Sequence, residues 1–156
     1  MNNIDIANEQ TALPVDELRL REIVEAMVED EFPAETHLSL AVVDDATIAR
    51  LHEEFLDEPG PTDVLSFLLE QEGDHLDGEV VASAETALRE APRYGWSPAE
   101  ELLLYLVHGL LHLAGYDDET AAQQAAMHGR EAEILARFGI TARHQEVVEG
   151  LEENKK

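Results

Sequence analysis

The apolar and polar positions of this chain follow two different periods. Apolar residues that recur every three or four positions predict a helix, and apolar residues that alternate with polar ones predict a strand. This succession predicts a small mixed sheet with helices packed against it, an α+β or α/β arrangement. The expected strands are 3–8, 37–43, 64–69 and 76–83, and the expected helices are 14–30, 45–55, 85–93, 98–114 and 120–138, with a loop at 57–62 and a turn at 71–74.

Two of these segments are apolar on nearly every side. The helix 98–114 has a sharp start, because Ser97 can cap it, Pro98 suits its first position and Glu100 can complete a capping box. Gly115 favours a left-handed end. A helix this apolar should lie inside the protein. The strand 64–69 is also mostly apolar, so we expect it to lie inside the sheet.

Length and composition restrict the architecture further. With 156 residues the chain suits one domain, which we expect at 1–140, followed by a flexible acidic tail at 141–156. The first residues show no basic segment followed by an apolar run, and the longest apolar run, 102–107, is too short for a membrane span. These features predict a cytoplasmic protein without a membrane partner. Cysteine is absent, so any metal must be held by His, Asp or Glu.

The net charge of −25 narrows the choice of partners. Eight arginines and two lysines face 35 acidic residues, and such a field repels nucleic acid at long range. The charge is either an adaptation for solubility or a functional acidic surface. It argues against a polyanionic substrate and against DNA, although a local groove or high salt can offset the overall field.

Two histidines on the apolar helix carry the main chemical signal. His108 and His112 are four residues apart, so both rings leave the same face of the helix one turn apart. Burying two unpartnered imidazoles in an apolar helix would cost several kcal/mol, roughly 2–7 for each polar group. A shared metal ion removes this cost, whereas the alternative is a hydrogen-bonded structural pair. We therefore predict one metal ion per chain.

A third ligand can follow the end of the helix. Asp118 comes six residues after His112, beyond the turn at Gly115, while Asp117 and His128 are alternatives. Three protein ligands leave a position for water, as in catalytic zinc sites. We therefore predict zinc, although a carboxylate ligand also suits manganese or another harder divalent ion.

The ligand spacing also resembles that of metzincin proteases, HExxHxxGxxH, with Asp118 in the place of the third histidine. Gly109 occupies the position of the glutamate that serves those proteases as general base. The remaining histidines have no ligand spacing, and we expect them to face solvent: His37, His52, His75 and His144. Tyr94 and Trp96 are expected to be packing residues.

Three segments together resemble the YbeY family of single-domain, metal-dependent endoribonucleases. They are Pro61–Phe67 (PTDVLSF), Asp77–Ser83, in which Glu79 replaces the usual Asp, and His108–Asp118 (HGLLHLAGYDD). Met127 and Glu131 also fall where the family tends to place Met and Glu.

The resemblance implies a mixed sheet of about four strands and about five helices, with the metal helix central. It further implies a metal cleft beside the PTDVLSF strand, and it makes Thr62, Asp63 and Ser66 candidates for lining the substrate groove. The implied activity is cleavage of single-stranded RNA in ribosomal RNA maturation and ribosome quality control, with rRNA and the ribosome as partners.

This chain departs from the family pattern at Asp118, which replaces a histidine, and at Leu56, which follows Phe55 where the family has an arginine. Two other functions therefore remain open. The first is a metallohydrolase of a peptide or small ester. The second is a ribosome-associated binding protein with reduced nuclease activity.

Overall fold

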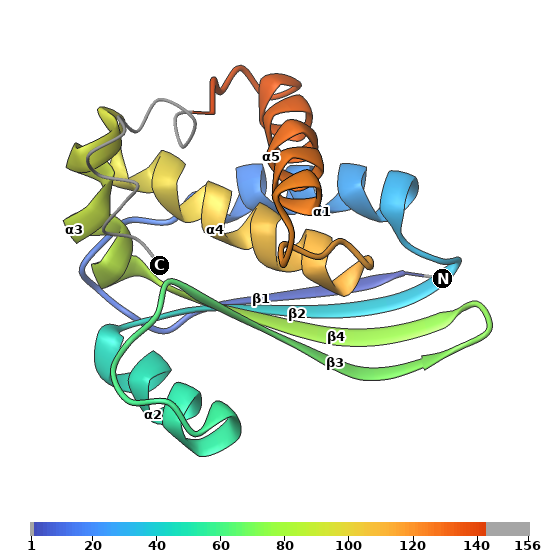
Figure 1. Ribbon diagram of the computed structural model, residues 1–156, viewed down its shortest axis with the longest axis horizontal. Coiled ribbons are helices and arrows are strands. Elements are labelled where there is room, and N and C mark those ends of the chain that lie inside the picture. The colour runs from blue at the N-terminus through green and yellow to red at the C-terminus, as the bar shows by residue number, and fades with distance from the viewer. Residues whose placement is uncertain (1, 143–156) are drawn as a thin grey trace.

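The computed structural model describes residues 2–142. It contains four strands and five helices in this part of the chain (Figure 1). The predicted element types and their order are confirmed. In chain order the elements are β1 (Asn3–Asn8), α1 (Glu17–Glu31), β2 (Glu35–Val43), α2 (Asp45–Leu56), β3 (Val64–Glu72), β4 (His75–Ser83), α3 (Ala84–Tyr94), α4 (Pro98–Leu113) and α5 (Ala121–Ala136).

The four strands form one mixed sheet in the order β1-β2-β4-β3. β1, β2 and β4 are parallel neighbours, and β3 pairs with β4 in antiparallel fashion. The prediction that 64–69 lies inside the sheet is wrong, because β3 is an edge strand. Its apolar run is explained by helices on both faces at its beginning, where Leu65 is buried, while Leu68 and Leu69 further along are exposed.

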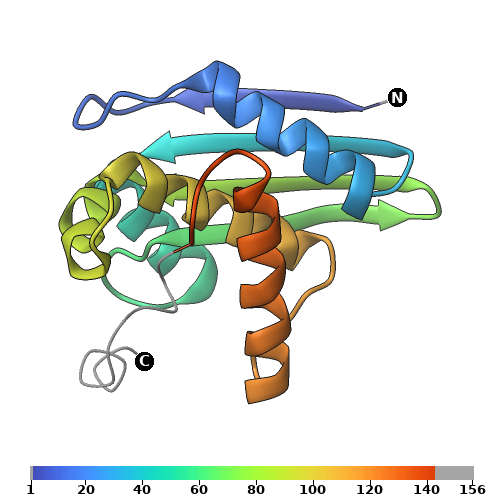
Figure 2. The same ribbon diagram turned by 90° about the horizontal axis from the view of Figure 1, so that it is seen from above.

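The hairpin that joins β3 and β4 is longer than predicted. Gln71 and Glu72, expected in a turn, still pair with Leu76 and His75. Only Gly73 and Asp74 are left to connect the two strands. A connection of two residues is common between antiparallel strands, because its twist matches that of the strands. β4 also stays paired with β2 as far as His75, so only the two-residue connection extends past the parallel strands (Figure 2).

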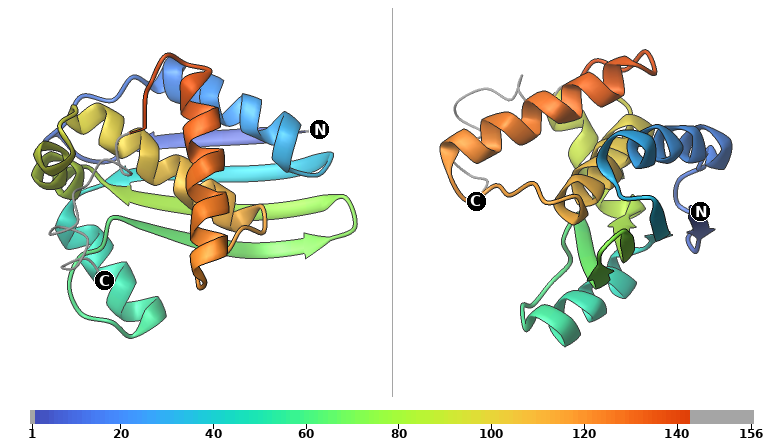
Figure 3. Two further views of the ribbon diagram at one scale, coloured as in Figure 1. Left: turned by 45° about the horizontal axis from the view of Figure 1, so that its top comes forward. Right: turned by 90° about the vertical axis from the view of Figure 1, so that its right-hand side faces the viewer.

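Helices cover the two faces of the sheet unequally. Figure 3 shows α1, α4 and α5 on one side of the sheet and α2 alone on the other. The main core lies under α1 and α4 and includes Leu38, Leu40 and Val80. A smaller core under α2 contains Val43, Ile48, Leu65 and Val81. The predicted central position of the apolar helix is confirmed, since α4 contacts β3, β4, α1, α3 and α5.

Asp45, the first residue of α2, connects this helix to the start of α3. Its carboxylate accepts hydrogen bonds from the hydroxyls of Ser83 (2.6 Å) and Thr86 (2.7 Å) and from the guanidinium of Arg89 (2.8 Å). Burial alone would raise the pKa of Asp45, but these hydrogen bonds outweigh it and lower the pKa below the ordinary value. The ionised carboxylate is therefore the form that holds α2 and α3 together.

The predictions about membrane spans and about the C-terminal tail can be compared with the described residues. No helix within residues 2–142 is both long and apolar enough to cross a membrane. The tail that we expect at 141–156 lies almost wholly outside the described residues, as does His144.

The Asp45 cluster leads to a prediction about stability. We expect Asp45→Asn to lower the free energy of unfolding at pH 7 by about 1–3 kcal/mol, because buried groups lose a charged hydrogen-bond partner. Since the pKa of Asp45 is lowered on folding, its contribution is present above the ordinary carboxyl pKa of ~3.9 and is lost as the pH falls through the lower, folded-state value. Urea unfolding of both proteins from pH 7 to pH 2 measures this difference.

The matched control is Glu54→Gln, which removes an exposed carboxylate from the same helix. A loss of stability in this control equal to that in Asp45→Asn, or a difference that grows toward low pH, would contradict the role given to Asp45.

Candidate metal centre

The helix that carries the two histidines is held firmly at both ends. At its start the Ser97 hydroxyl accepts from the Glu100 N–H, and the Glu100 carboxylate accepts from the Ser97 N–H, which completes the predicted capping box. At its end Gly115 has a φ of +111°. The Tyr116 N–H then donates to the Leu111 carbonyl at 3.0 Å, so the chain turns back beside the last turn of α4.

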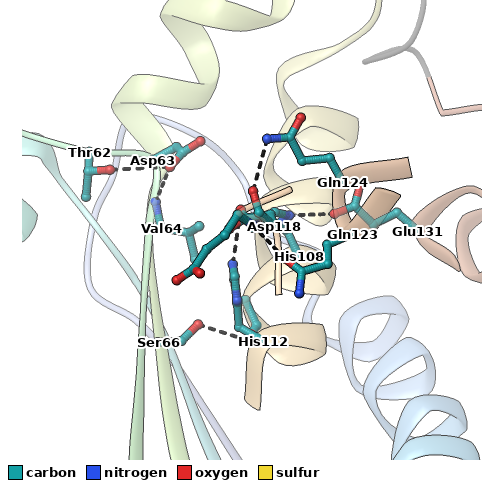
Figure 4. Close-up of polar contacts among 12 residues, drawn as sticks. Thr62, Asp63, Val64, Ser66, His108, His112, Asp118, Gln123, Gln124 and Glu131 are labelled. Atoms are coloured by element: carbon teal, nitrogen blue, oxygen red, sulfur yellow. Dashed lines mark hydrogen bonds and ion pairs between the residues drawn. The ribbon is translucent and has the colours of Figure 1, made fainter. Parts of the chain in front are cut away.

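This turn brings Asp118 to the two histidines. The Asp118 Oδ2 lies 3.4 Å from the Nε2 of His112 and 3.6 Å from the Nε2 of His108. The amide of Gln124 donates to the Asp118 carbonyl and fixes its backbone against α5 (Figure 4). All three side chains are half-buried, and their ligand atoms lie within 4.8 Å of one another. The structure thus brings together the three residues that the sequence indicated.

The spacing of these atoms fits a metal ion. Ligand atoms placed tetrahedrally at ~2.0–2.2 Å from zinc lie roughly 3.3–3.6 Å apart, which matches the distances from Asp118 to both rings. The two alternatives for the third ligand fit less well. Asp117 is exposed, and neither Asp117 nor His128 belongs to this group of ligand atoms.

A buried glutamate on α5 lies behind His108. Glu131 Oε2 is 2.5 Å from the Nδ1 of His108, on the opposite side of the ring from Asp118. Burial lowers the pKa of His108, but the hydrogen bond and charge of Glu131 outweigh it, so that the pKa is raised. No role was predicted for this residue from the sequence. Its position on the apolar face of α5, between Met127 and Ile134, was the signal that a buried partner exists.

The residue between the two ligands allows α4 to lie directly on the sheet. A Cβ atom at Gly109 would lie 2.7 Å from Val80 Cγ1, 2.9 Å from Ser66 Oγ and 3.0 Å from Val64 Cγ2. The Ser66 hydroxyl also donates to the Gly109 carbonyl at 2.8 Å. Gly109 is therefore explained by packing, since the sheet leaves no space for any side chain at this position.

A groove of about 370 Å³ runs over the two histidines. Its other walls come from Asp63–Ser66 and Leu68 on the β3 side, from Leu56 at the end of α2, and from Leu113. A smaller cavity of about 180 Å³ lies behind His108 and is lined in part by Asp63, Glu101, Tyr105, His128 and Glu131. Asp63 and His108 therefore face both spaces.

The three candidates for lining the substrate groove differ in their contacts. Ser66 and Asp63 line the groove. One carboxylate oxygen of Asp63 accepts from the Val64 N–H at 2.7 Å, which fixes the start of β3. The Thr62 hydroxyl lies 3.4 Å from this same oxygen, so Thr62 contacts the groove through Asp63.

The two aromatic residues that were expected to be packing residues differ in their surroundings. Tyr94 is buried, and the Trp96 indole donates to buried Glu101 at 2.7 Å.

A second group of possible ligands lies on the β3–β4 hairpin. Glu70, His75 and Asp77 have ligand atoms within 4.8 Å of one another. His75 was expected to face solvent, and its side chain is 44% exposed. His37 lies nearby, between Asp5 at 3.0 Å and Asp77 at 3.8 Å. Glu70 is exposed and the other two residues are half-buried, and none of the three lines the groove that runs over His108 and His112.

The sequence of this chain matches one known protein family over most of its length. The family model described as Endoribonuclease YbeY matches residues 5–139. The chain belongs to the YbeY family. The resemblance stated from the three sequence segments is therefore confirmed, and so is the α+β fold that it implied.

Individual relatives cover most of the chain. It is 41% identical over 150 residues to the endoribonuclease YbeY of Moorella thermoacetica. This match covers 86% of this chain and 96% of the relative. It is 50% identical over 105 residues to the YbeY of Rhodopirellula baltica, covering 66% of this chain and 54% of the relative. A solution structure of a Thermotoga maritima protein is similar at 27% identity and a TM-score of 0.60, covering 86% of this chain and 91% of the other.

The close approach at Gly109 leads to a prediction. We expect Gly109→Ala to lower the free energy of unfolding by about 1–3 kcal/mol, because the methyl group overpacks the contact with Val80 and Ser66. The control is Gly129→Ala on α5, where an added Cβ meets nothing within 4 Å. In this control alanine should stabilise the helix by about 0.5–1 kcal/mol.

Urea unfolding of the parent and both variants measures the two effects. Equal stabilisation by both substitutions would contradict the packing role of Gly109.

Proposed function

We propose that this YbeY protein is a metal-dependent endoribonuclease that cleaves single-stranded RNA during ribosomal RNA maturation and ribosome quality control. RNA and the ribosome are its proposed partners, and the cytoplasm, where ribosomes are assembled, is its proposed location. Its metal ligands are His108, His112 and Asp118, which hold one zinc ion per chain. The observation that carries this proposal is the grouping of these three ligands beside a groove that His108 and His112 line, in a chain of this family.

The chemistry follows from the ligand set. A divalent ion at such a site acidifies a bound water molecule and polarises a phosphoryl oxygen. The two imidazoles of α4 and the carboxylate from the turn after it would hold such an ion, and the groove lies over the same two rings. Asp63, just before β3, and Ser66, on β3, line the path along which a substrate would lie.

Zinc is the proposed ion because two histidines and a carboxylate form the ligand set of many zinc hydrolases. The same donor types also bind non-haem iron and harder divalent ions. Elemental analysis of the purified protein must therefore include manganese and iron. The structure supports a divalent ion by the spacing of the ligand atoms, and the measurement decides which ion is bound.

Hydrolysis of a peptide or small ester is less well supported. The proteases with this ligand spacing use a glutamate general base at the position of Gly109. Here any side chain at that position would collide with Val80, Ser66 and Val64. A role as a binding protein with reduced nuclease activity rests only on the departure from the family pattern at Leu56, whose apolar side chain lines the groove.

Loss of a metal ligand should abolish both metal binding and RNA cleavage. We expect His112→Ala and Asp118→Ala to contain less than one tenth of the parent's metal and to cleave single-stranded RNA at least 100-fold more slowly. The measurements are elemental analysis and cleavage of a labelled RNA oligonucleotide by protein purified in parallel. The matched control is His75→Ala, which should leave both quantities unchanged.

Each deviation has a distinct meaning. Equal cleavage by His112→Ala and the parent would point to a contaminating nuclease. Unchanged metal content in Asp118→Ala would remove Asp118 from the site. Loss of metal in His75→Ala would place an ion on the hairpin instead.

The apolar wall of the groove leads to a second prediction. Leu56 is 52% exposed and is followed by Asp57 and Glu58, so an RNA phosphate meets negative charge there. We expect Leu56→Arg to lower the KM for RNA about fivefold at low salt, an effect of roughly 1 kcal/mol, which disappears at high salt. In the parent, KM should fall as salt rises, because screening weakens the repulsion by the net charge of −25.

The control is Leu18→Arg, at a position on α1 that is 71% exposed and outside the groove. An equal effect of both substitutions would assign the change to net charge alone. An inactive parent that becomes active with Leu56→Arg would favour the reading of a binding protein with reduced nuclease activity.

A further inference from the structure

Glu131 differs from most acidic residues of this chain because it is buried. Its side chain is 2% exposed, and its neighbours on the same face of α5, Met127, Ile134 and Leu135, belong to the core. A carboxylate removed from water in this way is costly unless a charged or hydrogen-bonding partner compensates it. The partner shown by the structure is the Nδ1 of His108, at 2.5 Å.

The two nitrogens of the His108 ring therefore have different partners. Nδ1 points to Glu131, and Nε2 points to Asp118 at 3.6 Å and toward the groove. A carboxylate can only accept a hydrogen bond, so Nδ1 must carry the proton. The lone pair that remains for a metal ion is then on Nε2.

We propose that Glu131 is a positioning residue of the metal centre, which holds His108 in the tautomer and orientation that direct Nε2 at the ion. The proposal rests on the proposed metal site. Glu131 itself lies on the far side of the imidazole from the other two ligands and does not contact the ion. A carboxylate behind a ligating histidine also increases the basicity of the ring, and its loss typically weakens metal affinity 10- to 100-fold.

The two histidines are supported in different ways. Within residues 2–142, the polar partner of the His112 side chain is Asp118, and its ring lies edge-to-face with the His108 ring at a centroid distance of 4.8 Å. His112 therefore has no buried carboxylate behind it in the described part of the chain. Because His112 packs against the His108 ring, fixing one ring also limits the movement of the other.

The position of Glu131 links α5 to the centre. α5 begins at a capping box formed by Thr120 and Gln123, two and five residues after Asp118. The residues just before α5 therefore supply the third ligand, Asp118, and α5 itself carries Glu131, which contacts the first ligand, His108. α5 is thus part of the metal centre, although none of its own residues is in the ligand group.

The test compares Glu131→Gln with the parent. Glutamine keeps the shape and one acceptor oxygen but removes the charge. The matched control is Glu133→Gln, which neutralises an exposed carboxylate two residues away that pairs with Arg130. The dissociation constant for Zn²⁺ is measured by competition with a chromophoric chelator, and the melting temperature is measured with and without Zn²⁺.

We expect Glu131→Gln to bind Zn²⁺ 10- to 100-fold more weakly, while Glu133→Gln binds as the parent does. The rise in melting temperature on adding Zn²⁺ should shrink in Glu131→Gln only. Glu131→Asp, which keeps the charge on a shorter side chain, should recover part of the affinity. Unchanged affinity in Glu131→Gln, or an equal loss in Glu133→Gln, would overturn the proposal.

A spectroscopic measurement on the parent keeps the proposal testable even where a variant does not fold. Two-bond ¹H–¹⁵N correlation of the Zn²⁺-loaded parent reports which ring nitrogen of His108 carries the proton. The expected result is a proton on Nδ1 and metal on Nε2, and the reverse arrangement would overturn the proposal. A parent that binds no divalent ion would overturn the metal centre itself, which is a distinct outcome from a parent that binds Zn²⁺ independently of Glu131.

Discussion

The contact between α4 and the sheet at Gly109 determines where the two histidine ligands lie. The glycine has no side chain, its carbonyl accepts from the Ser66 hydroxyl, and the helix backbone rests against Val64 and Val80. The ligands His108 and His112 lie one residue before and three residues after this contact. Their height above β3 is therefore set by backbone packing, and their side chains reach a groove whose opposite wall is the same strand. A bulkier residue would lift the helix and separate the two walls.

Much of this arrangement follows from local features of the sequence. The capping residues and the apolar periodicity fix α4, and the spacing of four residues places the two rings on one face. The turn at Gly115 and the arrival of Asp118 also depend on nearby residues only. The edge position of β3 could not be predicted, because apolar content does not distinguish an inner strand from an edge strand covered by helices on both faces. Glu131 was given no role because its partner is 23 residues away and only the packing of α5 on α4 brings them together.

The centre is also anionic for a site that would receive RNA. Asp118 contributes one negative charge among the ligands, Glu131 contacts the His108 ring, and Asp63 lines the same cavity as His108 and Glu131. With an ion of charge +2, the carboxylates of Asp118, Glu131 and Asp63 give a formal sum of −1. Such a centre attracts phosphate less than one with three histidines would, so binding relies more on the shape of the groove and on its apolar wall at Leu56 and Leu68. Single-stranded RNA can offer such a wall the faces of its bases.

The edge position of β3 also affects how copies of the protein meet in solution. A free edge presents unpaired N–H and C=O groups to any other strand, and Leu68 and Leu69 make this one partly apolar. The outer end of the strand carries Glu70 and Glu72, so two copies pairing edge to edge would bring like charges together. The negative charge that disfavours an RNA substrate thus also disfavours edge-to-edge aggregation. It keeps β3, which lines the groove, free of a second strand.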